Sequence, residues 1–106
     1  MGFLNYAGIQ EVEFEDRTLA HLKVAITMKL RRQECFLLSW VNPPERGSGR
    51  ASLWLAPSIP IVFRFSGSRS PKLSETWITA MNELSHTPRG LIVMTEKEAE
   101  RYLASR

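Results

Sequence analysis

The sequence is poor in residues that bind metals or form covalent cross-links. Its 106 residues include one cysteine and two histidines. The lone Cys35 cannot form a disulfide within the chain, which fits a reducing cytoplasm, and we expect it to be a small buried apolar residue of a strand. His21 and His86 fall at no spacing typical of a zinc site. We therefore expect no metal and no cofactor.

Long hydrophobic runs and catalytic motifs are also missing. No apolar run approaches the ~20 residues that a membrane-spanning helix needs. The N-terminal stretch MGFLNYAGIQEVEFED lacks the basic and apolar regions of a signal peptide. The chain contains no phosphate-binding loop, no dinucleotide fingerprint and no Gly-x-Ser-x-Gly motif. We expect a cytoplasmic protein with no membrane partner and no catalytic residues, and we favour a non-enzymatic function.

Acidic residues are scarce in the middle of the chain. Residues 17–73 contain ten lysines and arginines but only two acids, Glu34 and Glu45, which gives this part a net charge of +8. The flanking residues contain four basic and nine acidic residues, a net charge of −5, and the whole chain is at +3. This uneven distribution of charge permits an anionic binding partner. A solvated surface that keeps the protein soluble would explain the charge equally well.

Hydrophobic periodicity predicts a single α+β domain over residues 1–106. Strands are expected over 3–6, 11–15, 35–41, around 53–55, over 61–65 and over 91–94, because apolar residues alternate or form short runs there. Helices are expected over 16–32, with Asp16 as N-cap, over 75–85, and after Thr95, where Thr95 and Glu98 form a capping box. The order ββαβββαβα lacks regular βαβ alternation and therefore predicts a mostly antiparallel sheet.

The first predicted helix has two apolar faces. Leu19, Leu22 and Ile26 form the main stripe, which Leu30 continues. His21, Val24 and Met28 lie on the opposite face among Arg17 and Arg31. This second face is either covered by another element of the chain or is a contact surface for a protein partner.

Two further segments combine arginine with a feature that is typical of nucleic-acid binding. The feature is an outward-facing aromatic ring in the first segment and a glycine-rich loop in the second. Trp54 and Arg64 fall on the outward side of their strands, so a sheet face carrying both could stack bases and pair phosphates. The alternative, which we favour, is a covering element with Arg64 lying along the indole. Arg46 and Arg50 flank a Gly-Ser-Gly stretch in the 42–50 loop, which could hold phosphate through free amides but is more simply a hairpin loop.

Two segments, EFEDRTLAHLKVAITMKLRRQECFLLSW (13–40) and SLWLAPSIPIVFRFSGSR (52–69), resemble a family of small actinobacterial proteins of about this length. The similarity covers nearly the whole chain. Members of that family have no established function and often carry the label ATP-dependent DNA ligase. Ligases of that class hold adenylate on the lysine of a Lys-x-Asp-Gly motif, which none of the four lysines begins. A chain of 106 residues is also too short for a two-domain ligase core, so the label would imply an accessory protein.

The sequence thus leads to two main functional hypotheses. The first is a non-catalytic module that binds DNA or RNA through Arg17, Arg31, Arg32, Arg46, Arg50, Trp54, Arg64 and Arg69. The alternative is a protein-interaction or homodimerisation module that uses His21, Val24 and Met28, or the face of Trp54. A DNA-ligase-associated protein, as the family label suggests, is a more remote alternative.

Overall fold

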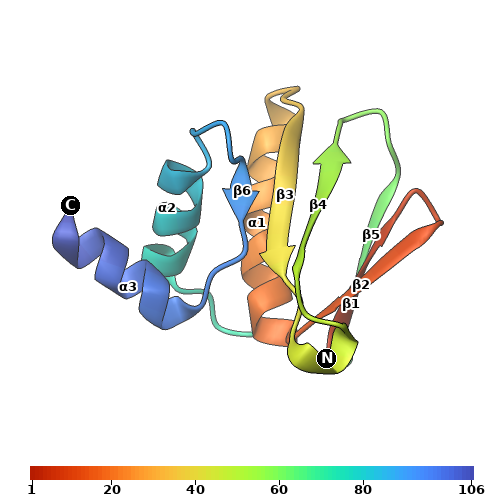
Figure 1. Ribbon diagram of the computed structural model, residues 1–106, viewed down its shortest axis with the longest axis horizontal. Helices are drawn as coiled ribbons and strands as arrows, with labels where there is room; N and C mark the ends of the chain where they lie inside the picture. Colours follow the sequence, from red (N-terminus) through yellow and green to blue (C-terminus); the bar gives the residue numbers. More distant parts are fainter. The chain divides into compact units, whose positions relative to one another are not determined.

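The order of helices and strands matches the sequence prediction. A computed structural model describes residues 1–106, and Figure 1 shows its elements. They are β1 (Gly2–Tyr6), β2 (Gln10–Phe14), α1 (Asp16–Arg31), β3 (Phe36–Val41), the 3₁₀ helix η1 (Pro44–Arg46), β4 (Arg50–Leu55), β5 (Ile61–Arg64), α2 (Glu75–Leu84), β6 (Leu91–Ile92) and α3 (Glu96–Ser105). The α+β class and the order ββαβββαβα are therefore confirmed.

The six strands form two sheets of three strands. One sheet has the order β2-β1-β5 and is antiparallel throughout. The other has the order β4-β3-β6, in which β3 pairs antiparallel with β4 and parallel with β6. Pro57 and Pro60 separate β4 from β5, and a proline cannot donate a ladder hydrogen bond. β5 instead pairs with β1, where Phe63 lies opposite Leu4.

The chain divides into two compact units. The first unit comprises residues 1–34 and 56–74, and the second comprises residues 35–55 and 75–106. The first unit therefore holds β1, β2, α1 and β5, and the second holds the remaining elements. Each unit is made of two chain segments that are far apart in the sequence. The prediction of a single domain over the whole chain stays a prediction.

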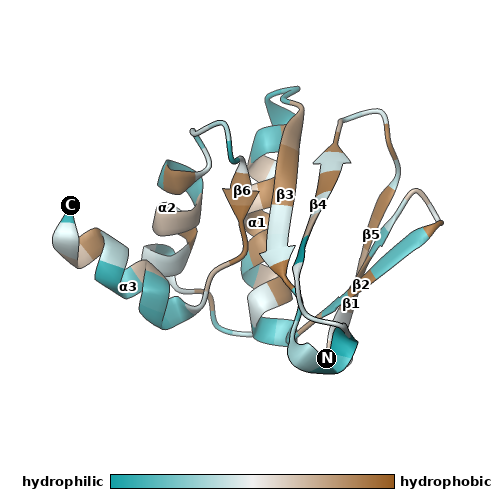
Figure 2. Ribbon diagram, viewed as in Figure 1, coloured by the Kyte–Doolittle hydropathy of each residue, from teal (hydrophilic) through white to brown (hydrophobic).

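The first unit buries the apolar side of its hairpin and one stripe of α1. Val12 and Phe14 are buried, while Glu11 and Glu15 are exposed, which is the predicted alternation along β2. The expected stripe of α1 is confirmed, because Leu19, Leu22 and Ile26 are fully buried, with Leu30 half-buried. In Figure 2, β2 is largely hydrophilic, as expected for a strand with one glutamate-rich side.

Asp16 has a different role from the predicted N-cap. It is the first residue of α1, and Glu15 occupies the cap position without a side-chain hydrogen bond to the helix. The Asp16 carboxylate instead accepts hydrogen bonds from the backbone amides of Ser66, at 3.2 Å, and Gly67, at 3.3 Å. A carboxylate can satisfy backbone donors outside its own helix equally well. These hydrogen bonds therefore hold the segment after β5 against the start of α1.

In the second unit, β3 lies between β4 and β6 and contributes the most apolar strand. Phe36, Leu38 and Trp40 are buried on one side of it, as predicted, and Figure 2 shows β3 as mainly hydrophobic. Helix α2 contacts β6 and α3, and it buries Trp77 and Met81. The indole N–H of Trp77 donates to the carbonyl of Met94 at 3.1 Å. The burial of this indole is therefore accompanied by a hydrogen bond.

Helix α3 is fixed at both of its ends. Thr95 and Glu98 form the predicted capping box at its start. Near its end, Tyr102 and Arg106 both donate to the carboxylate of Glu83 on α2. The hydrogen bond from Arg106 lowers the pKa of Glu83 below its usual value of 4.5.

Gly90 allows β6 to approach β3 closely. Its φ is +76°, and a Cβ atom there would lie 2.4 Å from the carbonyl oxygen of Leu37. Gly8 has nearly the same φ, +74°, but has no atom within 4 Å of that position. Comparing the two glycines therefore separates steric collision from backbone strain.

We predict that Gly90→Ala lowers the free energy of unfolding more than Gly8→Ala does. Both variants force alanine into the left-handed region, at a cost of about 1 kcal/mol. Only Gly90→Ala adds a collision with backbone, which we expect to cost about 1–3 kcal/mol more. Urea unfolding of both variants measures the difference. Equal losses would show that β6 can shift away from β3 without cost.

Candidate functional site

Strand β4 presents an unusual row of side chains to solvent. Arg50, Ser52 and Trp54 alternate with Ala51, Leu53 and Leu55, and the first three are exposed. Trp54 is 55% exposed, although its large apolar ring would ordinarily be mostly buried. The covering element that we favoured from the sequence is therefore not supported for this residue. The outward row carries an aromatic ring, a hydroxyl and a guanidinium at intervals of two residues.

The register of β3 against β4 completes this surface. Leu37 lies opposite Trp54, Ser39 opposite Ser52, and Val41 opposite Arg50. Directly opposed side chains lie on the same side of a sheet, about 5 Å apart at Cβ. The hydroxyl oxygens of Ser39 and Ser52 are accordingly 2.7 Å apart, in hydrogen-bonding distance. We call this set the β3–β4 face: Leu37, Ser39, Val41, Arg50, Ser52 and Trp54.

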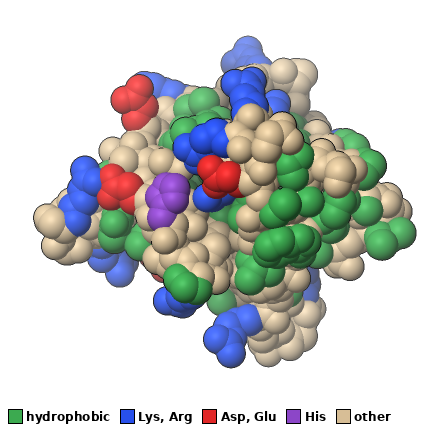
Figure 3. Space-filling model, turned by 90° about the horizontal axis from the view of Figure 1, so that it is seen from above, with side chains coloured by type: hydrophobic (Ala, Val, Ile, Leu, Met, Phe, Trp, Pro, Cys, Tyr) green, Lys and Arg blue, Asp and Glu red, His purple; other side chains and the backbone are tan.

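The β3–β4 face combines apolar and cationic groups and has no carboxylate. Val41 is 72% exposed, and it lies opposite Arg50 at the end of the sheet where the loop begins. Leu37 and Ser39 are half-buried. Figure 3 shows one face of the molecular surface, on which hydrophobic side chains are exposed with lysine and arginine side chains among them. An exposed aromatic ring on the same sheet face as a positive charge is a typical feature of a binding surface.

Trp54 and Arg64 do not share a sheet, so their predicted joint surface is wrong. Trp54 belongs to the β4-β3-β6 sheet, whereas Arg64 belongs to the β2-β1-β5 sheet. The Arg64 guanidinium lies over the ring of Phe3, at 5.0 Å from its centroid. It also donates to the carboxylate of Glu11 at 3.4 Å. The interruption of the strands by Pro57 and Pro60 explains why the alternation pattern misled us.

The loop between β3 and β4 is a hairpin loop without a phosphate clamp of free amides. The amide of Gly47 donates to the carbonyl of Pro44, and the amide of Ser48 donates to that of Pro43. The amide of Asn42 closes the loop by donating to Gly49 at 2.8 Å. Most of the amides that we considered as phosphate donors are therefore used within the loop. Arg46, in η1, and Arg50 are both exposed.

The other predicted phosphate-binding arginines belong to the first unit. They are Arg17, Arg31, Arg32, Arg64 and Arg69. Arg17 is half-buried, and Arg31 and Arg69 are exposed. Arg32 pairs with Glu34 at 2.8 Å, and Lys29 pairs with the same carboxylate at 3.2 Å. Only Arg46, Arg50 and Trp54 lie in the second unit, where Arg50 and Trp54 share the β3–β4 face.

His21, predicted as an interface residue, is fully buried, so this prediction is wrong. Its Nδ1 atom donates to the carbonyl of Arg17 at 2.7 Å. Its Nε2 atom accepts a hydrogen bond from the amide of Ser74 at 2.8 Å. This pair of contacts requires the neutral ring with the proton on Nδ1. The helix face that carries His21 is covered there by the segment that leads to α2.

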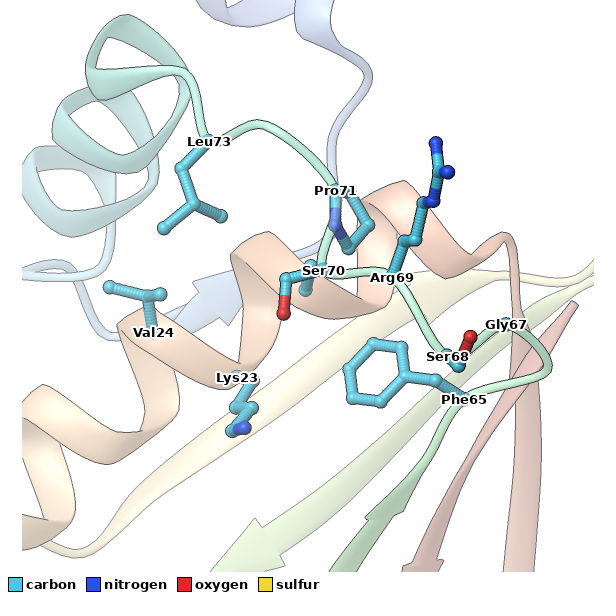
Figure 4. A pocket seen from close by; sticks show the side chains of 10 residues that line it. Lys23, Val24, Phe65, Gly67, Ser68, Arg69, Ser70, Pro71 and Leu73 are labelled. Carbon is cyan, nitrogen blue, oxygen red and sulfur yellow. The ribbon is translucent and has the colours of Figure 1, made fainter.

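The two remaining interface candidates have different surroundings. Met28 is 37% exposed, whereas Val24 is half-buried. Val24 lines a pocket of about 310 Å³ between α1 and the segment 65–73, which Figure 4 shows from close by. The other lining residues are Ala20, Lys23, Phe65, Gly67, Ser68, Arg69, Ser70, Pro71 and Leu73. Sequence reasoning missed this pocket, because no local pattern shows that the segment 65–73 lies against α1.

Cys35 also differs from its prediction. It lies one residue before β3 and is exposed rather than buried. The strand begins at Phe36, one residue later than we expected, so Cys35 lies outside it. No group of three or more histidine, cysteine, aspartate or glutamate residues is placed to hold a metal ion. None of the helices has the length and hydropathy that crossing a bilayer requires.

Comparison with known families assigns the chain to a family without assigning a function. Residues 1–96 match the model of DUF7882, described as a domain of unknown function. The chain therefore belongs to this family, and both units lie largely within the matched region. No curated protein and no solved structure is significantly similar to the chain. The sequence resemblance to an uncharacterised family of small proteins is thus confirmed at that level.

We predict that His21→Ala destabilises the protein strongly. The variant removes a fully buried ring and leaves the amide of Ser74 without this acceptor. We expect a loss of about 2–4 kcal/mol in the free energy of unfolding, measured by urea denaturation. The Ser74 amide should also exchange faster with deuterium. The matched control is His86→Ala, which we expect to change stability by less than about 0.5 kcal/mol, because His86 is exposed. Similar stability of the two variants would contradict this role.

Proposed function

We propose that the protein is a non-catalytic accessory module that binds single-stranded nucleic acid on the β3–β4 face. The observation that carries the proposal is the 55% exposed indole of Trp54 on the same sheet face as Arg50. A side chain that exposes so much aromatic surface gains free energy when a flat partner covers it. Nucleotides are flat partners that also carry negative charge.

The arrangement on the face fits the parts of a nucleotide chain. A base would stack on Trp54, and a phosphate would pair with Arg50, which is roughly 13 Å away along the strand. Between them, the hydroxyls of Ser39 and Ser52 can hydrogen-bond to sugar or base edges. Arg46, in the adjoining loop, adds positive charge in the same unit.

The same features favour single strands over duplexes. Bases in a duplex are stacked on one another and are not available to an indole, whereas unpaired bases can be splayed onto an aromatic side chain. The β3–β4 face has one large ring and few base-reading amide groups. We therefore expect weak sequence preference and a pronounced salt dependence.

We predict that Trp54→Ala and Arg50→Ala each weaken binding to a labelled single-stranded oligonucleotide. Loss of a stacked base should raise the Kd by about 5- to 150-fold for Trp54→Ala. Arg50→Ala should weaken binding uniformly across sequences and should reduce its salt dependence. Fluorescence anisotropy at about 50 and 200 mM salt, with single- and double-stranded DNA and RNA, measures both effects.

Val62→Ala is the matched control, since Val62 is also an exposed apolar strand residue but lies in the other sheet. It should bind like the unaltered protein. The proposal fails if no probe binds at the lower salt concentration. It also fails if Val62→Ala and Trp54→Ala weaken binding equally.

The second candidate is a protein-interaction or homodimerisation module. The exposure of Val41 and Trp54 on one sheet face, and of Met28 on α1, favours it. Light scattering across a concentration series would reveal a stable oligomer. In that case, Met28→Glu or Trp54→Ala would disrupt the oligomer according to which surface forms it.

The proposed cellular location, origin and pathway of the protein rest on the sequence. We place the protein in the cytoplasm, where its exposed and unpaired Cys35 would stay reduced. An actinobacterial origin and a role beside a DNA ligase are the more remote part of the proposal, suggested by the family label alone. Binding to single strands near a break would be compatible with such a role.

A further inference from the structure

The segment that follows β5 is attached to α1 at both of its ends. The carboxylate of Asp16 accepts from the amides of Ser66 and Gly67, and Nε2 of His21 accepts from the amide of Ser74. Asp16 and His21 are five residues apart on one helix, which corresponds to about 7.5 Å along its axis. The eight residues from Gly67 to Ser74 are joined by seven steps and could span about 23 Å if extended. The segment must therefore bow away from α1.

The bowed segment and α1 line the open pocket of about 310 Å³, which is at the lower end of the size range of small-molecule sites. Figure 4 shows its two halves. Val24 and Leu73 face each other on one side, and Lys23 lies near Phe65 on the other. The Nζ atom of Lys23 is 5.8 Å from the centroid of the Phe65 ring. One part of the pocket is thus apolar and the other is cationic.

The polar half holds donors and no carboxylate. Lys23 and Arg69 are the charged residues among the lining side chains, and Ser68 and Ser70 add two hydroxyls. The amides of Ser68, Arg69 and Ser70 donate to no acceptor within the protein. In Figure 4 the guanidinium of Arg69 is directed away from the pocket, whereas the hydroxyl of Ser70 points toward α1 and Lys23 lies on the side of Phe65. Lys23 forms no ion pair with any carboxylate of the chain.

We propose that this pocket binds a small organic phosphate, a monoester whose apolar or aromatic group lies against Val24 and Leu73. A phosphate monoester carries close to two negative charges and three terminal oxygens, which match an ammonium, hydroxyls and backbone amides. A carboxylate ligand has only one negative charge and two oxygens, so it would leave more of these donors without an acceptor. The inference concerns the first unit and does not rest on the proposed nucleic-acid binding, which concerns the β3–β4 face of the second.

The test is a titration of the isotope-labelled full chain with phenyl phosphate, followed by amide resonances in NMR spectra. Inorganic phosphate and phenol serve as separate probes of the two halves. We expect saturable shifts at the amides of Ser68, Arg69, Ser70 and Val24. Phenyl phosphate should bind at least about tenfold more tightly than inorganic phosphate, because it also buries an apolar ring.

Lys23→Gln should weaken phenyl phosphate binding about tenfold, since it removes the cation beside Phe65 without changing the length of the side chain greatly. Lys23 is exposed, so the variant should fold normally. Lys97→Gln, on α3, removes the same charge outside the pocket and should leave the affinity unchanged. Trp54→Ala should also leave it unchanged, which separates this proposal from nucleic-acid binding.

Three results would overturn the inference. The first is the absence of saturable shifts in the segment 65–73 at millimolar phenyl phosphate. The second is equal affinity for phenyl phosphate and inorganic phosphate, which would show that the apolar half takes no part. The third is equal weakening by Lys23→Gln and Lys97→Gln, which would indicate attraction to the overall charge of the protein and not to this site.

Discussion

The antiparallel register of β3 against β4 is the constraint on which the proposed function depends. Because side chains alternate along a strand, this register places Trp54, Ser52 and Arg50 on the exposed side. A slip of one residue would turn Leu53 and Leu55 to solvent and bury the indole and the guanidinium. Burial of Leu55 and of Phe36, its partner on β3, opposes such a slip. Burial of the apolar side of the sheet therefore determines which side chains lie on its exposed side.

The first unit shows a comparable dependence of a candidate site on hydrogen bonds between side chains and backbone amides. Asp16 and His21 use side-chain acceptors on α1 to satisfy backbone amides of the segment after β5. Satisfying these amides gives that segment a defined position, and the pocket exists because the segment is longer than the distance between its two attachments. The two candidate sites use different chemistry. The β3–β4 face offers an exposed ring to a flat partner, whereas the pocket offers donors and an apolar wall to a small anion.

The sequence predicted features that depend on local periodicity. These include the order of elements, the stripe of α1 through Leu19 and Ile26, and the capping box at Thr95. It failed where distant segments meet. Nothing local shows that Arg64 pairs across to β1 while Trp54 pairs with β3, because strand partners are chosen by tertiary packing. Asp16 and His21 likewise accept hydrogen bonds from backbone amides more than 45 positions away in the sequence. The pocket could not be predicted for the same reason.

The most direct test of the β3–β4 face follows the three indole N–H resonances during titration with an unlabelled single-stranded oligonucleotide. The indoles of Trp40 and Trp77 donate to Asn42 and Met94 within the protein, so they are internal references. Our account predicts that the resonance of Trp54 shifts or broadens with saturation while the other two change little. Oligonucleotide binding that leaves the Trp54 resonance unchanged would contradict it.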